Sequence, residues 1–159
     1  MTVLSAREGY RLWAPSYADE TAISFLEMDL ASDLTPPLEG LRLLDAGCGT
    51  GLSGPSLKAL GYGDIAGLDL SDDMLRIAGS RQANGKPAYS ELKKAMLGGP
   101  LPWPDRHFRA FFSTGVFTIG HAPASGLHEL VRITKSGGHA IFTVRDQVLE
   151  SGGFQAVFE

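Results

Sequence analysis

The feature that most constrains the fold is a series of glycines that directly follows a short apolar segment. Residues 43–44 are leucines, Asp45 follows, and glycines then occupy positions 47, 49 and 51. Glycine has no Cβ and adopts positive φ readily, so the backbone can turn tightly and approach a ligand closely. A helix expected from about Ser53 would point its N-terminus at this turn. The pattern predicts a strand, a loop and a helix that together form a nucleotide-type cofactor site.

The chain after this motif alternates between strand-like and helix-like segments. Residues 88–107 are ambiguous, and within them 98–105 are a loop rich in glycine and proline. Either Ser71 or Asp72 can cap the second helix. Such alternation predicts an α/β fold with a parallel sheet and helices on both faces. The expected strands are 41–45, 64–69, 108–114 and 139–145, and the expected helices are 53–60, 73–82, 123–134 and 148–159.

The N-terminal part of the chain is expected to be helical and aromatic. Tyr10, Trp13 and Tyr17 lie on one helical face. These rings could form a lid over a ligand, or they could fix the first helix to the sheet. A length of 159 residues fits one domain. We therefore expect a single domain with a helical lid over 1–38 and an α/β core over 41–159.

Charge and composition argue against several classes of partner. The chain has 14 basic and 18 acidic residues, a net charge of -4 and no basic stripe, so a nucleic-acid partner is not expected. It has neither a signal-peptide pattern nor 18 consecutive apolar residues, which argues against a membrane partner. Cys48 is the one cysteine, and the histidines show no metal-ligand spacing. We expect a cytoplasmic protein without a bound metal.

Asp69, at the end of the second expected strand, narrows the choice of cofactor. It follows Gly47 by 22 residues, close to the spacing at which an acid binds a ribose diol. A dinucleotide frame, G-x-G-x-x-G, also begins at Gly49. However, Asp45 would repel a pyrophosphate, whereas it would favour a ligand that carries an ammonium or sulfonium group. A nicotinamide dinucleotide is therefore the less favoured alternative.

Six segments carry a family pattern. They are Tyr10-x-x-Trp13-Ala14-x-x-Tyr17, Leu44-Asp45-Ala46-Gly47-Cys48-Gly49-Thr50-Gly51, Gly67-Leu68-Asp69-Leu70-Ser71-Asp72-Asp73-Met74-Leu75, residues 101–108, residues 130–138, and Phe117-Thr118-Ile119-Gly120-His121-Ala122-Pro123. Together they resemble the class I S-adenosylmethionine-dependent methyltransferases, and the last segment is similar to the methyltransferase-like 27 subgroup. The resemblance covers nearly the whole chain. It implies a Rossmann-like, mostly parallel sheet with strand order 3-2-1-4-5.

The resemblance also implies S-adenosylmethionine as cofactor, S-adenosylhomocysteine as product, and roles for individual residues. The backbone at Gly47 and Gly49 would approach the methionine part, and Asp45 would lie near its ammonium group. Asp69 would bind the ribose hydroxyls, and Leu70 would pack on the adenine. The full set of expected cofactor-binding residues is Tyr10, Trp13, Tyr17, Asp45, Ala46, Gly47, Cys48, Gly49, Asp69, Leu70, Met74, Met96, Leu97, Ser113 and Thr114.

Three features depart from the family pattern. Met96 stands where members often carry an acid that accepts a hydrogen bond from the adenine amino group. Ser136 replaces the usual proline, and the chain stops at Glu159 without the usual final hairpin of two strands. We expect that the chain is truncated at its C-terminus. The alternative is that a partner, such as a second copy in a dimer, covers the exposed strand 139–145.

The function expected is methyl transfer to an unidentified small-molecule acceptor by in-line displacement. His121 could act as the general base if the acceptor needs one, or it could simply cap the helix that starts near Pro123. Cys48 is interpreted as a small space-filling residue rather than a nucleophile. Two alternatives remain, a cofactor-binding domain without turnover and, less favoured, an NAD-dependent oxidoreductase.

Overall fold

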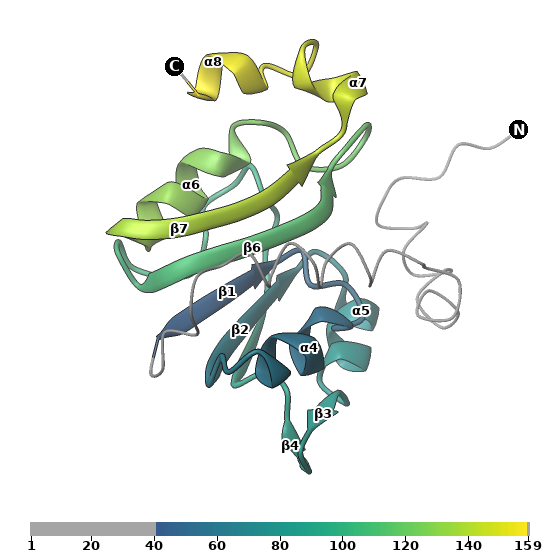
Figure 1. Ribbon diagram of the computed structural model, residues 1–159. Helices are drawn as coiled ribbons and strands as arrows, with labels where there is room; N and C mark the ends of the chain where they lie inside the picture. Colours follow the sequence, from purple (N-terminus) through teal and green to yellow (C-terminus); the bar gives the residue numbers. More distant parts are fainter. Residues whose placement is uncertain (1–40, 159) are drawn as a thin grey trace, which may run out of the picture.

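The computed structural model describes residues 41–158, which contain one five-stranded parallel sheet (Figure 1). The expectations for Tyr10, Trp13, Tyr17 and the lid over 1–38 lie outside the described residues. The sheet order is β5-β2-β1-β6-β7, and these five strands, counted along the chain, give the expected order 3-2-1-4-5. The strands are β1 (Arg42–Ala46), β2 (Asp64–Asp69), β5 (Glu91–Lys94), β6 (Phe108–Phe117) and β7 (Thr134–Val144).

Helices cover both faces of the sheet, as expected. On one face, α4 (Ser53–Ala59) and α5 (Asp72–Ala78) contribute Leu57 and Ala78 to an apolar cluster that includes Leu43 and Ile65. Successive side chains of a strand point to opposite faces, so the residues that follow Leu43 and Ile65 in the chain lie in a second apolar cluster on the other face of the sheet. That second cluster contains Leu44, Leu68, and residues from α6 (Gly126–Ile133) and α8 (Phe154–Phe158).

The structure corrects the expected elements between the second helix and residue 107. Helix α5 ends at Ala78, before the expected end at 82, and β3 (Gln82–Ala83) and β4 (Lys86–Pro87) then form a small hairpin that was not expected. Asn84 and Gly85, both with positive φ, form its two-residue turn. Strand β5 lies within the ambiguous segment 88–107, and its four residues are too polar and too few to give a clear strand pattern.

The later elements also differ from their expected bounds. Strand β6 continues to Phe117, past its expected end at 114. Helix α6 begins at Gly126 and not at 123, because the Gly126 N–H donates to the Pro123 carbonyl in a turn that precedes the helix. Strand β7 begins at Thr134, before the expected start at 139, and its pairing with β6 shifts register between Phe108 and Ala110. Residues 146–158 form two short helices, α7 (Asp146–Leu149) and α8, instead of one.

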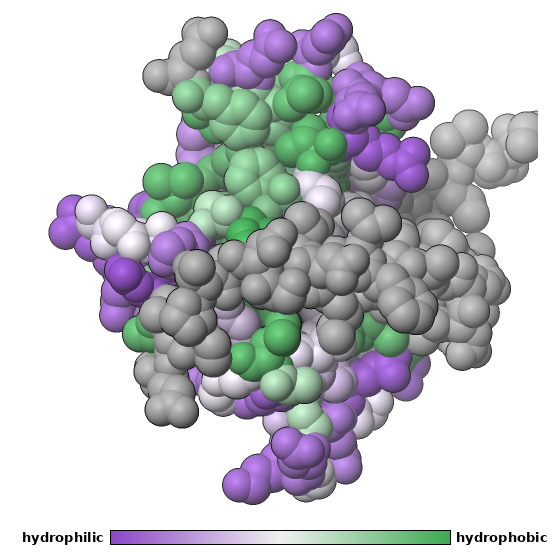
Figure 2. Space-filling view, in the orientation of Figure 1, coloured by the Kyte–Doolittle hydropathy of each residue, from purple (hydrophilic) through white to green (hydrophobic). Residues whose placement is uncertain are grey.

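Strand β7 lies at an edge of the sheet, beside α7 and α8 in Figure 1. Figure 2 shows mainly apolar surface on this side of the molecule, beneath the polar residues at its top. Phe158 is 54% exposed there, and its ring lies 6.1 Å from that of Phe142 on β7. No helix within residues 41–158 is long and apolar enough to cross a bilayer.

Candidate cofactor site

A cavity of about 510 Å³ opens at the carboxyl ends of the parallel strands. Ligand sites in open α/β sheets commonly lie at this edge, and the volume is in the range of small-molecule pockets. Its walls are formed by Gly47 and Gly49 after β1, Leu68 and Asp69 at the end of β2 with Leu70 and Met74 after it, residues 95–98 after β5, residues 114–116 in the last part of β6, and residues 120–123 after β6.

The glycine loop is held between β2 and the last part of β6. The N–H groups of Gly47 and Cys48 both donate to the Leu68 carbonyl, at 2.7 and 2.9 Å. Gly47 has a φ of 80° and Gly49 a φ of 53°. A Cβ at Gly47 would lie 2.3 Å from Cγ2 of Val116. The loop thus needs glycine for its conformation and for the close approach of Val116.

Asp69 connects the glycine loop to the start of α5. Its carboxylate accepts the Gly49 N–H at 2.9 Å and the Ser71 N–H at 2.8 Å. Burial raises the pKa of Asp69 above its usual value, although the N–H groups of Ser71, Gly49 and Leu70 oppose this shift. A carboxylate offers about four acceptor positions, so these two bonds leave capacity for the two hydroxyls of a ribose. Ser71 itself caps α5, because its Oγ accepts the Met74 N–H at 3.3 Å.

Apolar side chains form the wall next to Asp69. Leu70, Met74 and Leu97 line the cavity there, together with Met96, which is 59% exposed. Among the described lining residues, Asp69 is the one carboxylate, and neither lysine nor arginine is present. A flat apolar ring with a polar sugar fits this wall, whereas a pyrophosphate would find no cationic side chain on it.

Four expected site residues lie behind the glycine loop and do not line the cavity. Asp45 is buried and accepts a hydrogen bond from the Tyr89 hydroxyl at 2.7 Å. Ser113 Oγ donates to the carbonyl of Ala46 at 2.8 Å. Burial, with the nearby charges of Asp45 and Asp69, raises the pKa of the Cys48 thiol well above its usual value. A protonated, buried thiol supports the interpretation of Cys48 as a space-filling residue.

His121 lies in the exposed loop after β6 and also lines the cavity. Its Nδ1 is 3.0 Å from the carbonyl of Ile119 in the same loop. Helix α6 begins at Gly126 with Ser125 at its N-cap position, so the interpretation of His121 as the cap of that helix is wrong. Thr114, also expected at the site, lines the cavity at the carboxyl end of β6.

Sequence reasoning missed several residues that shape the site. Val116 lies against Gly47, but a valine in an apolar strand carries no signal beyond that of an ordinary core residue. Gly98 has a φ of 103°, and a Cβ there would lie 2.7 Å from Cγ of Pro123. Gly98 and Gly99 lay in the expected loop 98–105 and Pro123 at an expected helix start, but their contact joins different parts of the chain and no local pattern signals it.

Comparison with known proteins points to one family. A family model described as "Methyltransferase domain" matches residues 44–142. The human Methyltransferase-like protein 27 is 34% identical over 143 residues, which cover 86% of this chain and 56% of that protein. The Ubiquinone biosynthesis O-methyltransferase of Alkalilimnicola ehrlichii is 29% identical over 123 residues, which cover 76% of this chain and 48% of that protein. The chain thus spans about half the length of these curated relatives.

A solved structure shows the same fold. The crystal structure of a SAM-dependent methyltransferase from Aquifex aeolicus aligns with a TM-score of 0.60 at 21% sequence identity. The alignment covers 77% of this chain and 65% of the other. At this identity the likeness concerns the fold, and it agrees with the strand order and with helices on both faces of the sheet.

Proposed function

The chain belongs to the class I S-adenosylmethionine-dependent methyltransferases, and from that premise we propose that it transfers the methyl group of S-adenosylmethionine to a small-molecule acceptor. The observation that carries the proposal is the Asp69 carboxylate in the cavity wall, 2.9 Å from the N–H of Gly49. In this arrangement an acid that would bind a ribose lies next to bare backbone, and no lysine or arginine is among the described residues that line the cavity.

The lining residues fit the parts of this cofactor. Asp69 would hold the ribose hydroxyls, and Leu70 with Leu97 would contact the adenine ring. The backbone at Gly47 and Gly49 would lie along the methionine part. Asp45, behind the loop, would add a negative charge that favours the ammonium and sulfonium groups. These assignments, together with those for the other expected residues, are part of the proposal.

When bound, the cofactor supplies a methyl group on a positively charged sulfur that a nucleophile displaces in line. The task of the chain is then to align the acceptor and to exclude water. Residues 114–116 and 120–123 form the cavity wall that would face the acceptor. His121 in this wall would take up the proton of an attacking hydroxyl, thiol or amine group.

The nature of the acceptor is the finer part of the proposal. Val116, Ala122 and Pro123 make the acceptor side of the described wall apolar, which favours a small apolar molecule. The relative from Alkalilimnicola ehrlichii bears the name of a ubiquinone biosynthesis enzyme, which is consistent with an acceptor of this kind. The cytoplasmic setting and a dimer through residues 139–145 remain predictions.

A cofactor-binding domain without turnover is the second candidate. It is favoured by Met96, which is exposed at the cavity where family members often carry a hydrogen-bonding acid. Losing one such hydrogen bond would weaken cofactor binding by about 0.5–1.5 kcal/mol without abolishing it.

Methyl transfer can be tested with S-adenosylmethionine that carries a radiolabelled methyl group. The protein would be incubated with a panel of phenols, thiols and amines, and the organic extract would be counted. We expect label in at least one apolar acceptor and a lower count with His121→Ala. Cofactor binding without labelled product would favour the second candidate. Absence of both binding and product would contradict the proposal.

A further inference from the structure

Three glycines from two parts of the chain surround one buried aromatic ring. A Cβ at Gly51 or at Gly54 would lie 2.9 or 2.6 Å from Cε2 of Tyr89. A Cβ at Gly67 would lie 3.1 Å from Cδ1 of the same ring. Ordinary contacts between carbon atoms are about 3.5–4.0 Å, so a side chain at Gly54 would displace the ring, and one at Gly51 or Gly67 would press on the ring and also on Ala78 or Leu92. Gly51, Gly54 and Gly67 therefore form a slot for Tyr89, and none of the three lines the cavity.

The Tyr89 hydroxyl reaches from this slot to Asp45. It donates to Oδ2 of Asp45 at 2.7 Å, and Tyr89 and Asp45 are only 6% and 2% exposed. A hydrogen bond to a carboxylate in such a dry environment is among the stronger kinds. Burial, with the neighbouring Asp45 charge, raises the pKa of Tyr89 well above its usual value, so the hydroxyl keeps the proton that it donates.

The segment that carries Tyr89 is fixed to the sheet. The Ser90 N–H donates to the carbonyl of Ile65 on β2 at 2.8 Å. Nearby, Nε of Arg81 donates to the carbonyl of Thr50 in the glycine loop at 2.9 Å. Tyr89 is thus a rigid support behind the loop, while Gly47 and Gly49 present the other side of the same loop to the cavity.

We infer that Tyr89 is a positioning residue, which sets the glycine loop and the Asp45 carboxylate for binding of a cofactor with a positively charged sulfur. This inference rests on the proposed function. The ring fixes the position of the loop, and the hydroxyl fixes the direction of the buried negative charge. S-Adenosylmethionine carries a sulfonium charge that S-adenosylhomocysteine lacks, so the hydroxyl contributes more to the affinity for the first than for the second.

Calorimetric titration of Tyr89→Phe with both compounds tests the role of the hydroxyl. We expect the affinity for S-adenosylmethionine to fall about fivefold to tenfold and that for S-adenosylhomocysteine about twofold. A purely structural role would lower both affinities by the same factor. Tyr62→Phe is the matched control, because Tyr62 is buried in the same apolar cluster but does not line the slot, and it should change neither affinity.

Gly54→Ala tests the slot independently of the hydroxyl. We expect this change to lower the affinity for S-adenosylmethionine about tenfold in the parent, because the new Cβ displaces the ring. In a Tyr89→Leu background the same change should have less than about a twofold further effect, since the two sites are coupled. Gly63→Ala is its control, because nothing lies within 4 Å of a Cβ there.

The outcomes separate this inference from the proposed function. If the parent binds both compounds and Tyr89→Phe leaves their ratio of affinities unchanged, the inference is overturned and the proposed function stands. If Gly54→Ala and Tyr89→Leu have additive effects on the affinity for S-adenosylmethionine, the inference that the glycines position the Tyr89 ring is likewise overturned. If the parent binds neither compound, the proposed function and the inference are both overturned.

Discussion

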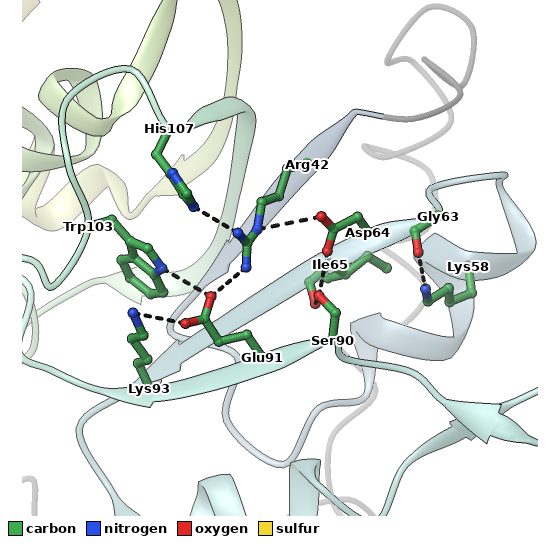
Figure 3. A network of polar contacts seen from close by, with 10 residues as sticks. All are labelled: Arg42, Lys58, Gly63, Asp64, Ile65, Ser90, Glu91, Lys93, Trp103 and His107. Atoms are coloured by element: carbon green, nitrogen blue, oxygen red, sulfur yellow. Dashed lines mark hydrogen bonds and ion pairs between the residues drawn. The ribbon is translucent and has the colours of Figure 1, made fainter.

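The two ends of the parallel sheet differ in what their side chains contact. Where the strands begin, charged residues contact one another: Arg42 Nη1 lies 2.8 Å from His107 Nε2, and Arg42 Nη2 lies 2.5 Å from Glu91 Oε2 (Figure 3). Arg42 Nε is also 3.6 Å from Oδ2 of Asp64. Where the strands end, glycine backbone and the Asp69 carboxylate face a cavity. One end stabilises the sheet with its charges, and the other leaves polar groups available for a ligand.

The network at the strand starts is extended by Lys93 and Trp103. Lys93 Nζ lies 2.8 Å from Glu91 Oε1 and 4.9 Å from the centre of the Trp103 ring. Burial alone would raise the pKa of Glu91, but hydrogen bonds from Lys93 and Trp103 lower it overall. Burial and the Arg42 charge lower the pKa of His107, so a neutral ring accepts the bond from Arg42. Mutations where the strands begin should therefore lower the free energy of unfolding, and mutations where the strands end should lower the affinity for the cofactor.

The largest effect is expected from Asp69→Ala at the cavity end. Loss of the carboxylate would remove the two hydrogen bonds proposed to the ribose, and the affinity for S-adenosylhomocysteine should fall about 100-fold or more. The free energy of unfolding should fall by only about 1–2 kcal/mol, because the N–H groups of Gly49 and Ser71 lose their acceptor. Calorimetry and urea denaturation measure the two quantities. Asp72→Ala, at an exposed acid on α5, is the control and should leave the affinity within about twofold.

Arg42→Met at the other end should give the opposite result. We expect the free energy of unfolding to fall by about 2 kcal/mol, because Glu91 and Asp64 lose their partner in a partly buried network. The affinity for S-adenosylhomocysteine should stay within about twofold of that of the parent. Lys58→Met, at an exposed lysine that contacts the Gly63 carbonyl, should cost less than about 0.5 kcal/mol. A large loss of affinity in Arg42→Met would show that the two ends are not separable.

Residues 95–107 lead from the end of β5 to the start of β6, and their contacts with α6 make a smaller, pH-dependent contribution to the free energy of unfolding. Glu129 accepts the Leu101 N–H at 2.8 Å, and Arg132 pairs with both Glu129 and Asp105. The hydrogen bond from Arg132 lowers the pKa of Glu129 to about 2 from its usual 4.5. Between these values the unfolded chain binds more protons, so the stabilisation is complete above pH 4.5 and is lost as the pH falls toward 2.

Glu129→Gln should therefore be less stable than the parent at neutral pH and should lack this part of the pH dependence. Because solvent screens a partly exposed pair, the difference between the two proteins should shrink by about 1 kcal/mol as the pH falls. Urea denaturation at several pH values measures it. A constant difference over the whole range would contradict the role of the ion pair.

The smallest effect on cofactor affinity is expected from His121→Ala. The ring is exposed and contacts the Ile119 carbonyl of its own loop, so its loss should leave the affinity for S-adenosylhomocysteine within about twofold. Fluorescence or calorimetric titration can show this. A tenfold loss of affinity would indicate that His121 contacts the cofactor and not the acceptor.

How far the sequence predicts the structure also differs between the two ends. The glycine pattern and Asp69 lie close together in the chain, and they predicted the β1–α4 turn and the position of the cavity. The network of Arg42, Glu91 and His107 was not predicted, because Glu91 is 49 residues and His107 is 65 residues along the chain from Arg42. Such pairs become visible only when the parallel register is known.

The same limit applies behind the cavity. Asp45 was predicted to lie near the ammonium group, but its contact with Tyr89 spans 44 residues and no short motif signals it. Strand β5, which leads from Tyr89 to the cavity wall, was missed because packing against β2 rather than its own sequence makes it a strand. Local patterns thus identified the loop, and tertiary contacts determined what supports it.

Thermal unfolding with added nucleotides tests the central claim most directly, that S-adenosylmethionine binds at the carboxyl ends of β1 and β2. A ligand present at 100 times its Kd stabilises the folded state by about 2.7 kcal/mol. We predict that S-adenosylhomocysteine raises the unfolding temperature of the parent but not of Asp69→Ala, and that NADH raises neither. A rise with NADH and none with S-adenosylhomocysteine would contradict the account.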